Sequence, residues 1–451
     1  MDRLTVLDEF RRSLAERIRR PPTPCPEQRP FWCDHGGDAG LSAAAEDLAP
    51  VGAWPSYVAQ AAIGYVIYGL GAAGPYLRTQ LGLSDAEVGL HSTAMAVGLV
   101  VAGTLAAGFG RRFGETAVRG AAIAAIGVAI PVLATAPTVL ATLGASLLIG
   151  LSAGTLLGHV NTTLGAPGGR LARLRLARAN VWAMISAFVG PIIVAAGASV
   201  GPGWWVGLAP ALVLLGVVAL DTRSRRHVVA AAPAGNDRGS LPRSYWLAWT
   251  FLVAAISVEF SIVFWGATLV ERRTHVSIPE ATAIGALFLG GMFAGRLGLS
   301  VGIGAGHDIR RNAATGLVLA GVGAGIAWVS TAPIISAAAL FLAGVGVAVL
   351  YPLGVAAALA GAPAQLALAG NRLTLASGLA ILVAPLALGA IADATGVIAG
   401  WGLVLGLVAV ALCLVFGLST GQPAQASRAD RADRADAPDP ADPADLTSKP
   451  A

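Results

Sequence analysis

Long apolar runs, separated by short polar segments, fill the chain between residues 55 and 418. A helix needs about 20 apolar residues to cross the hydrocarbon core of a bilayer, which is about 30 Å thick. Twelve runs come close to this length, and several are joined only by a proline and its neighbour. We therefore expect an all-α integral membrane protein with twelve transmembrane helices, at residues 55–77, 87–109, 117–136, 138–161, 179–200, 203–220, 245–269, 281–302, 312–331, 333–355, 371–392 and 396–418.

Polar segments flank and divide this membrane region. In the N-terminal extension, residues 1–53, apolar side chains recur at helical spacing among arginines up to Arg20, which predicts a basic amphipathic helix before a proline-rich stretch. Such a helix lies on an anionic cytoplasmic leaflet; the alternatives are an extension without a role or a start codon set too early. The extension lacks the uninterrupted apolar stretch of a signal peptide. Residues 419–451 repeat Arg-Ala-Asp units and are expected to be disordered.

The composition agrees with a membrane protein and excludes several mechanisms. Charged residues make up 12% of the chain, and the mean hydropathy is +0.71; soluble domains carry about 25% charged residues. Lys449 is the one lysine in the sequence. A Walker A loop needs a lysine to reach the phosphates of ATP, and a retinal or pyridoxal Schiff base needs a buried one. We therefore expect no ATP-driven pump and no such cofactor.

Metal and nucleic-acid binding are not expected either. Cys25 and Cys33 stand near His35, but seven residues separate the two cysteines, whereas zinc sites pair ligands two to four residues apart. With Cys413 as the third cysteine, no disulfide framework is indicated. The net charge of +5 comes from arginines that are scattered among short loops, which is not the basic stripe of a nucleic-acid-binding surface.

The distribution of arginines predicts the orientation of the chain. An even number of spans leaves both termini on one side. If that side is the cytoplasm, the internal connections hold fifteen arginines and the external ones three, namely Arg78, Arg272 and Arg273. Cytoplasmic loops carry the excess of positive charge, so we expect both termini in the cytoplasm. The longest connection between spans, the basic linker at residues 221–244, then divides two sets of six spans, residues 54–220 and 245–418.

Several motifs of this region resemble those of the major facilitator superfamily. Between spans two and three the superfamily has a Gly-x-Leu-Ala-Asp-Arg-x-Gly-Arg-Arg type of pattern; here the chain reads Gly-Thr-Leu-Ala-Ala-Gly-Phe-Gly-Arg-Arg from Gly103 to Arg112, and a second register aligns Arg112-Phe113-Gly114. The aspartate of the pattern is absent in both registers. Weaker matches lie at residues 291–297, 344–352 and 376–396. The resemblance covers about residues 54–418.

The resemblance implies a fold and a mechanism. The superfamily consists of secondary transporters with two pseudo-symmetric six-helix bundles, which expose a central cavity to each side of the membrane in turn. The residues that the resemblance places in the gating loops are Gly103, Gly110, Arg111, Arg112, Gly114, Gly295, Arg296 and Asp308. Because the usual aspartate is missing, its conformational-locking role does not carry over intact.

Glu259 is the strongest candidate for a functional charge. It lies near the middle of span seven, and no other charged residue stands within ten positions on either side. A charge in the bilayer costs about 2.5–3.5 kcal/mol even on translocon scales, and an apolar environment favours the neutral form of a carboxyl. Such a group can take up and release a proton as the cavity changes sides. The alternative is an acid kept protonated, or paired with an arginine, for structural reasons only.

Arg296, in the inner half of span eight, has two interpretations. It can attract an anionic substrate or pair with Asp308 within the gating loop, and the superfamily pattern favours the second. His91 and His159 can titrate near neutral pH, but a lone histidine near a helix end is more often a satisfied polar residue. Polar side chains expected to line the cavity are Gln60, Tyr57, Tyr65, Tyr68, Asn161, Asn180 and Trp182.

Taken together, these features predict a proton-coupled secondary transporter rather than an enzyme. Residues 186–195 partly match the Gly-x-x-x-Gly-Pro-x-x-Gly-Gly pattern of the superfamily's antiporters, which favours export of a small organic solute. An importer of a sugar or small metabolite and a transporter-like membrane sensor are the alternatives. Arginine in place of lysine, with abundant alanine and glycine, is typical of a bacterial protein. We expect a monomer in the plasma membrane, with protons, lipid and a small solute as its partners.

Overall fold

The computed structural model describes residues 53–165, 169–200, 203–224, 240–300 and 308–418. The chain divides into two compact units, Met1–Gly52 and Ala53–Ala451, and all described residues belong to the second. The expected amphipathic helix at the N-terminus and the repetitive tail lie outside the described residues, as does most of the linker. The domain limits drawn from the sequence thus stay predictions.

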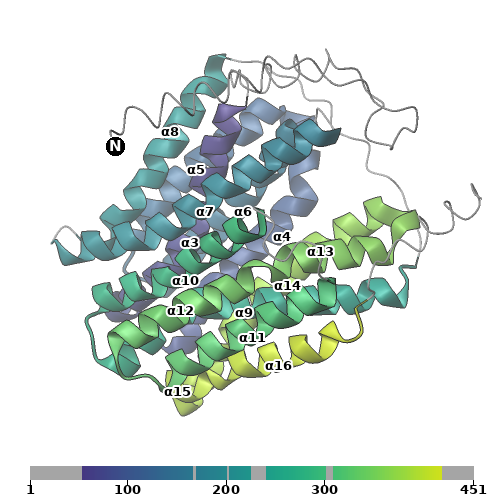
Figure 1. The fold of residues 1–451 in the computed structure, drawn as a ribbon. Helices are drawn as coiled ribbons and strands as arrows, with labels where there is room; N and C mark the ends of the chain where they lie inside the picture. The colour runs from purple at the N-terminus through teal and green to yellow at the C-terminus, as the bar shows by residue number, and fades with distance from the viewer. Residues whose placement is uncertain (1–52, 166–168, 201–202, 225–239, 301–307, 419–451) are drawn as a thin grey trace, which may run out of the picture. The chain divides into compact units, whose positions relative to one another are not determined.

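Every element in the described part of the chain is a helix (Figure 1). The elements are α3 (Trp54–Leu81), α4 (Asp85–Phe113), α5 (Glu115–Thr135), α6 (Val139–Gly165), α7 (Gly169–Ser199), the 3₁₀ turn η1 (Trp204–Leu208), α8 (Ala209–Ser224), α9 (Arg243–Thr274), α10 (Ile278–Ser300), α11 (Ile309–Val329), α12 (Pro333–Ala348), α13 (Leu350–Gly361), η2 (Pro363–Gln365), α14 (Leu366–Thr395), α15 (Val397–Gly400) and α16 (Gly402–Val415).

Each apolar run identified in the sequence overlaps one of these helices or a pair of them. Within the described residues, ten segments are long and apolar enough to cross a membrane, and α12 with α13 counts as one of them. The two runs outside this set are α3, with 28 residues, and the shorter segment Trp204–Leu220. The chain is therefore a multi-pass membrane protein with at least ten candidate spans.

Short signals in the sequence explain the tight turns. Ser84 accepts a hydrogen bond from the backbone N–H of Glu87, and the Glu87 carboxylate accepts one from the backbone N–H of Ser84. This capping box starts α4 two residues after Gly82, whose left-handed backbone (φ 65°) ends α3. Two long helices thus reverse direction within three residues.

Glycines let particular helices pack with their backbones in contact. A Cβ at Gly150 of α6 would overlap the Met95 carbonyl oxygen of α4, and a Cβ at Gly344 of α12 would overlap the Phe288 carbonyl oxygen of α10. Close packing of this kind holds helices together where burial in lipid gives no hydrophobic drive. The pairs α4–α6 and α10–α12 therefore repeat one packing device in the two parts of the chain.

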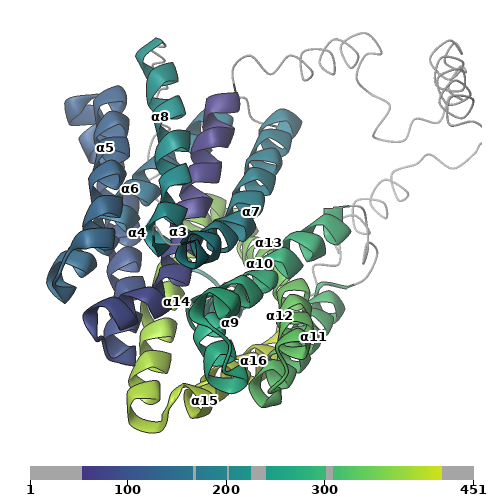
Figure 2. The same ribbon diagram turned by 90° about the vertical axis from the view of Figure 1, so that its left-hand side faces the viewer.

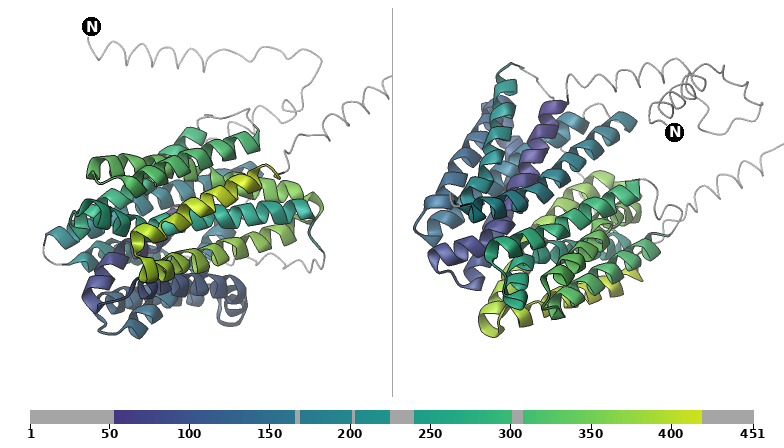
Figure 3. Two further views of the ribbon diagram at one scale, coloured as in Figure 1. Left: turned by 90° about the horizontal axis from the view of Figure 1, so that it is seen from below. Right: turned by 60° about the vertical axis from the view of Figure 1, so that its left-hand side comes forward.

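Helices from the two parts of the chain also meet each other. Figures 2 and 3 show α5, α6 and α8 on one side and α11, α12 and α16 on the other, with α3, α7, α10 and α14 between them. Gly89 of α4 approaches the backbone of Leu386 in α14, and Gly290 of α10 approaches the ring of Phe188 in α7. The Thr93 hydroxyl of α4 donates to the Leu382 carbonyl oxygen of α14 at 2.7 Å. These contacts position the site described next.

Candidate functional site

The buried carboxyl of Glu259 has a partner from a distant part of the chain. The Tyr68 hydroxyl, on α3, donates a hydrogen bond of 2.8 Å to Glu259 Oε1, on α9. Both residues are buried, with exposed fractions of 9% and 5%. The ring of Phe260 stacks on Tyr68 with the ring centroids 5.9 Å apart. The carboxyl that the sequence singles out thus lies in an apolar environment with one neutral donor beside it.

A narrow cavity opens beside this pair, between α3, α7, α9 and α10. Its lining residues are Tyr68, Ala72, Pro191, Val263, Ala267, Thr282, Gly285, Ala286, Phe288 and Leu289. Tyr68 and Thr282 bring the only side-chain hydroxyls to this lining. Val263 and Ala267 follow Glu259 at intervals of four residues, so the carboxyl lies on the same face of α9. The cavity therefore combines an apolar wall with a protonatable group next to it.

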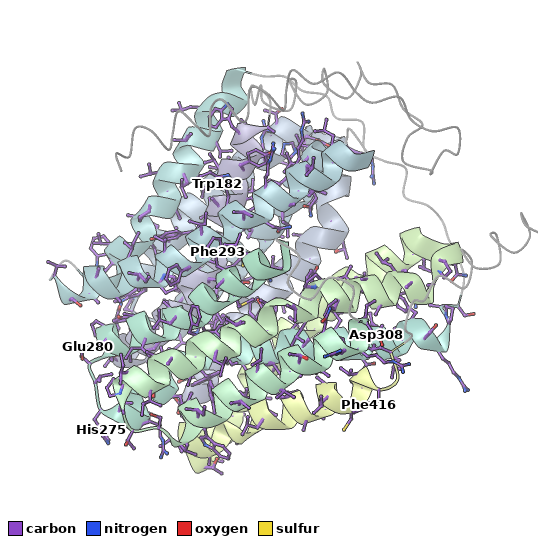
Figure 4. All side chains as sticks on the ribbon, viewed as in Figure 1. Trp182, His275, Glu280, Phe293, Asp308 and Phe416 are labelled. Atoms are coloured by element: carbon purple, nitrogen blue, oxygen red, sulfur yellow. The ribbon has the colours of Figure 1, made fainter. Side chains whose placement is uncertain are left out.

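A single face of α10 connects the cavity to Arg296. Thr282, Ala286, Leu289, Phe293 and Arg296 follow one another at intervals of four and three residues, which is the spacing of one helix face. At 1.5 Å per residue, Arg296 lies about 10 Å beyond Leu289 along the helix. Figure 4 labels Phe293, which stands between them in this series. The arginine thus shares the cavity face of α10.

The expected pairing of Arg296 with Asp308 is not observed. Asp308 immediately precedes α11 with an exposed side chain, and no ion pair joins it to Arg296 in the described part of the chain. Arg296 is half-buried.

The gating-loop residues of the first part occupy the end of α4 and its turn to α5. Gly103, Arg111 and Arg112 are exposed, Gly110 is half-buried, and Gly114 makes the turn with a φ of 85°. The Arg112 guanidinium lies 5.3 Å from the centroid of the Phe113 ring. Of the corresponding residues in α10, Gly295 packs against α12, where a Cβ would meet Ala348. The described structure thus places the motif arginines at a helix end, with exposed side chains.

At the opposite ends of these helices, charged side chains join four elements. Arg78 Nη2 on α3 lies 2.8 Å from Glu271 Oε2 on α9, and Arg78 Nη1 lies 3.4 Å from Asp85 Oδ1 on α4. The Asp393 carboxylate on α14 accepts hydrogen bonds from the backbone N–H groups of Asp85 (2.7 Å) and Ala86 (3.0 Å). We call Arg78, Asp85, Glu271 and Asp393 the polar clasp. Sequence reasoning missed it, because Glu271 and Asp393 are far along the chain from Arg78 and Asp85.

The remaining aromatic candidates differ in their surroundings. The Tyr65 hydroxyl donates to the Gly207 carbonyl oxygen at 2.6 Å, so it links α3 to η1, and Tyr57 is half-buried. Trp182, marked in Figure 4, is 51% exposed. It stands nine positions before Pro191, on the opposite face of α7. Trp182 therefore does not line the cavity, and amphipathic rings of this kind suit a membrane interface.

The three candidates with amide side chains differ in burial and in their position relative to the cavity. Gln60 is 8% exposed, and its buried Oε1 atom has no hydrogen-bond partner in the described part of the chain. Asn161 is exposed, on α6 outside the cavity lining. Asn180 is exposed too, but it stands eleven positions before Pro191, on the cavity face of α7. Gln60 is thus the one buried amide among the candidates, and its acceptor is unused.

The two histidines have partners. His91 Nδ1 lies 2.8 Å from the Glu87 carbonyl oxygen and Nε2 lies 3.0 Å from Thr142 Oγ1, which is the satisfied state expected of it. His159 Nε2 lies 2.7 Å from Arg119 Nη1, and its Nδ1 lies 3.7 Å from Glu115 Oε2. Among the described residues, no cluster of three or more potential metal ligands occurs; Cys25, Cys33 and His35 lie outside them.

Solved structures of transporters resemble this chain over most of its length. A bacterial homologue of the human lysosomal transporter Spinster, in an inward-facing and occupied conformation, matches with a TM-score of 0.64 and 13% identity, over 80% of this chain and 95% of the homologue. A variant of the nucleoside transporter NupG matches with a TM-score of 0.64 and 14% identity, over 80% of this chain and 97% of the NupG chain. A variant of the peptide transporter POT in complex with alafosfalin matches with a TM-score of 0.64 and 18% identity, over 82% of this chain and 96% of the POT chain.

No protein-family model matches the chain, and no curated protein sequence matches it either. At identities below 20% the structural matches show the fold. That fold is the one that the resemblance to the major facilitator superfamily implies. The three matches cover 80–82% of this chain and 95–97% of the matched chains.

Proposed function

We propose that this chain is a proton-coupled secondary transporter of the major facilitator superfamily, which moves a small organic solute by alternating access. The observation that carries the proposal is the hydrogen bond from Tyr68 to Glu259 beside the cavity. It joins the one acidic side chain in the middle of a membrane helix to a helix from the other part of the chain.

Proton coupling needs a carboxyl whose charged and neutral forms are both accessible. Burial favours the neutral form of Glu259, while the hydrogen bond that Tyr68 donates favours the ionised form. Opposing influences of this kind keep a group responsive to its surroundings. Because Tyr68 and Glu259 lie on helices from the two parts of the chain, a change in protonation alters a contact between those parts. This links the proton to the conformational change.

Alternating access needs one closed end and one open end. In the proposed topology there are twelve spans in two six-helix bundles, residues 54–220 and 245–418, with both termini in the cytoplasm. The polar clasp then closes the external end, and the exposed residues at the end of α4 face the cytoplasm. Figure 2 shows α7 and α10 diverging toward one end, which agrees with an inward-open state. The inward-facing neighbour structure supports the same assignment.

Export is the direction that we propose, into the medium of a bacterial cell from its plasma membrane. The partial antiporter pattern around Gly190 and Pro191 favours it, and Pro191 lines the cavity. Import of a small metabolite by the same carboxyl is the alternative. A sensor would need the N-terminal extension to act on a signalling partner, and loss of residues 1–50 without loss of flux would argue against it. A non-enzymatic role as a monomer fits the transporter fold of the neighbours.

Proton movement in inside-out vesicles tests the proposal. Vesicles with an acidic lumen receive a panel of organic compounds, and collapse of the pH gradient is compared with vesicles that lack the protein. Collapse by one class of compound, dependent on the protein, supports antiport and identifies the class. A gradient that no compound affects, in vesicles shown to hold folded protein, contradicts antiport and favours symport or sensing.

A further inference from the structure

The cavity beside the Tyr68–Glu259 pair has the size of one water molecule. Its volume is about 20 Å³, and a buried site needs about 10–15 Å³ to hold a water. Apolar cavities stay dry, whereas a buried water is held by roughly two to four polar partners. The hydroxyl groups around this cavity therefore decide whether it holds a water.

Two hydroxyls of the cavity lining have acceptor capacity for a water. The Tyr68 hydroxyl donates its proton to Glu259 Oε1 at 2.8 Å, and the Thr282 hydroxyl donates its proton to the Ile278 carbonyl oxygen at 2.8 Å. A hydroxyl oxygen also carries two lone pairs that accept hydrogen bonds. A water in the cavity supplies two O–H groups, so it can donate one to each of these oxygens.

A third hydroxyl near the cavity, on Tyr76, needs a partner. Tyr76 is 8% exposed, and its hydroxyl has no hydrogen-bond partner in the described part of the chain. Leaving a buried hydroxyl unpaired destabilises a fold, so such a group indicates a bound water or ion. The Tyr76 O–H group can donate to the oxygen of a water that donates to the other two hydroxyls.

Tyr76 lies on the cavity side of α3. Ala72 lines the cavity and follows Tyr68 by four residues, and Tyr76 follows Ala72 by four more. This spacing keeps the three side chains along one side of the helix. The Tyr76 ring stacks on the Trp204 ring, with the centroids 6.0 Å apart. The ring is thereby held at the outer end of the row that begins at Tyr68.

Thr282 lies at the same depth as Tyr76. On α3, the residue two positions after Tyr76 pairs with Glu271 of α9. On α10, which runs in the opposite direction to α9, Gly285 lies against Ala267, where a Cβ would be 3.2 Å from the Ala267 nitrogen. Counted along α9 from these two contacts, Tyr76 and Thr282 differ in level by about 1.5 Å. Since α3 and α10 also contact each other, the two hydroxyls flank the same end of the cavity.

We infer that the cavity is a water site, in which the hydroxyls of Tyr68, Thr282 and Tyr76 hold one water that carries the proton between Glu259 and the external side. The role in proton transfer rests on the proposed transport function. A proton that arrives at the water passes to the Tyr68 oxygen, while the original Tyr68 hydroxyl proton passes to Glu259 Oε1. One O–H bond forms and one breaks at Tyr68, so the tyrosine stays neutral and the carboxylate becomes the neutral acid. Thr282 and Tyr76 are positioning residues for the water.

The outer end of this route is closed in the present state. Tyr76 is buried under Trp204, whose Nε1 donates to Gln80 Oε1 at 3.1 Å, and the polar clasp lies at the same end of α3 and α9. Proton exchange with the external solution therefore waits until the clasp separates. A site of this size admits a water and excludes an organic solute, so the proton and the solute use different spaces.

An experimental structure of the full-length protein, at a resolution that shows buried waters, tests the site directly. We expect one water within about 3.2 Å of all three hydroxyl oxygens. An unoccupied cavity, or a direct hydrogen bond between Tyr76 and Thr282 without a water, would overturn the inference.

Thermal unfolding of Tyr76→Phe gives an independent test of the site. If the Tyr76 hydroxyl has no partner, its removal relieves an unpaired group and raises the Tm. If a water satisfies it, the variant loses a hydrogen bond and the Tm stays the same or falls. A rise in Tm would contradict the water site.

Solvent isotope effects test the role in proton transfer. The probe is a compound that collapses the pH gradient in inside-out vesicles, and proton movement is compared in H₂O and D₂O. Tyr76→Phe and Thr282→Val should slow this movement by about two- to tenfold, the effect of one lost hydrogen bond. Their isotope effect should rise, because proton transfer becomes the slow step. Thr282→Ser, which keeps the hydroxyl, should retain the parent's rate and isotope effect.

Tyr245→Phe is the matched control. Tyr245 is a buried tyrosine of α9 whose hydroxyl donates to the Ala369 carbonyl oxygen at 2.8 Å, fourteen positions or about 21 Å along the helix from Glu259. This variant should have a lower Tm and the isotope effect of the parent. An unchanged isotope effect in Tyr76→Phe, or an equal rise in Tyr245→Phe, would remove the proton role from the water.

The outcomes separate this inference from the transport proposal. A water on the three hydroxyls, without proton movement in response to any compound, would contradict proton-coupled transport and keep the water site. Proton-coupled flux in a protein whose structure shows no water in the cavity would keep transport and overturn the inference.

Discussion

Arg78 Nη2 lies 2.8 Å from Glu271 Oε2 and joins the C-terminal ends of α3 and α9 across 193 positions of the sequence. Both side chains are mostly buried, with exposed fractions of 13% and 20%. In the proposed topology this ion pair closes the external end of the transporter. Such a contact must break when the cavity opens outward, so it sets part of the free-energy difference between the two states.

Arg78→Gln should therefore shift the protein toward the outward-open state. Charge-assisted hydrogen bonds contribute about 1.5–3 kcal/mol, and partial exposure reduces this to about 1–2 kcal/mol, a shift of about five- to thirtyfold. The measurement uses a cysteine at the position of Ala72, a cavity residue, in a chain whose Cys25, Cys33 and Cys413 are replaced by serine. Labelling from the external side by an impermeant reagent should accelerate by that factor.

Arg272→Gln is the control for this experiment, because Arg272 is exposed beside Glu271. Its labelling rate should equal that of the parent. Equal rates in Arg78→Gln as well would show that the ion pair does not hold the external end closed.

Asp393→Ala should act in the same direction as Arg78→Gln. The Asp393 carboxylate accepts from the first backbone N–H groups of α4, where the helix dipole favours negative charge. Loss of this carboxylate removes a stabilisation of the closed external end of about 1 kcal/mol. The rate of external labelling should therefore rise by about three- to tenfold. Since both changes act on the N-terminus of α4 through Asp85, the double variant should show less than the product of the single effects. A full product would contradict the view that the polar clasp is one unit.

The helix contact at Gly150 predicts a stability effect. A Cβ there would overlap the Met95 carbonyl oxygen, whereas a Cβ at Gly144 of the same helix meets no atom within 4 Å. Gly150→Ala should lower the free energy of unfolding by about 1–3 kcal/mol through overpacking. Gly144→Ala should leave it unchanged or raise it slightly. Thermal unfolding in detergent distinguishes the two, and equal Tm values would refute the close α4–α6 packing.

Substitutions of two tyrosines of α3 distinguish a residue needed for proton coupling from one needed for stability. Tyr68→Phe removes the donor to Glu259 and should lower proton-coupled flux about tenfold, from a hydrogen bond to a charged group worth about 1.5 kcal/mol. Tyr65→Phe removes a donor to the Gly207 carbonyl oxygen and should lower the Tm while proton stoichiometry stays the same. Parallel losses of stoichiometry in both variants would remove the special role of the Tyr68 hydroxyl.

The helices were predictable because burial in lipid leaves a simple signature of length and hydrophobicity. Every expected run overlaps a helix, and prolines such as Pro137 and Pro333 mark the turns between them. The 3₁₀ turn before α8 and the break between α12 and α13 were not predicted, since both lie inside continuous apolar sequence. Local hydrophobicity carries no information on where such a run changes its helix type.

The sequence identified single residues of the site but not the contacts between them. Glu259 stands out because a lone carboxyl in a long apolar run is rare, and the structure buries it as expected. Its partner Tyr68 is 191 positions away, so one sequence alone cannot pair them. The family pattern favours a pair of Arg296 with Asp308, whereas no ion pair joins them in the described residues and Arg296 shares a face of α10 with Leu289. The clasp at Asp393 depends on helix ends that only the fold brings together.

Proton stoichiometry of the Glu259→Gln variant tests the central claim most directly. The variant keeps a hydrogen-bond acceptor for Tyr68 but cannot exchange a proton, and Glu280→Gln, at an exposed acid near the start of α10, is the matched control. In proteoliposomes loaded with substrate, we predict that Glu259→Gln retains substrate exchange while substrate-driven proton movement disappears, and that Glu280→Gln keeps both. Unchanged proton movement in Glu259→Gln would contradict the assignment of this carboxyl as the coupling site.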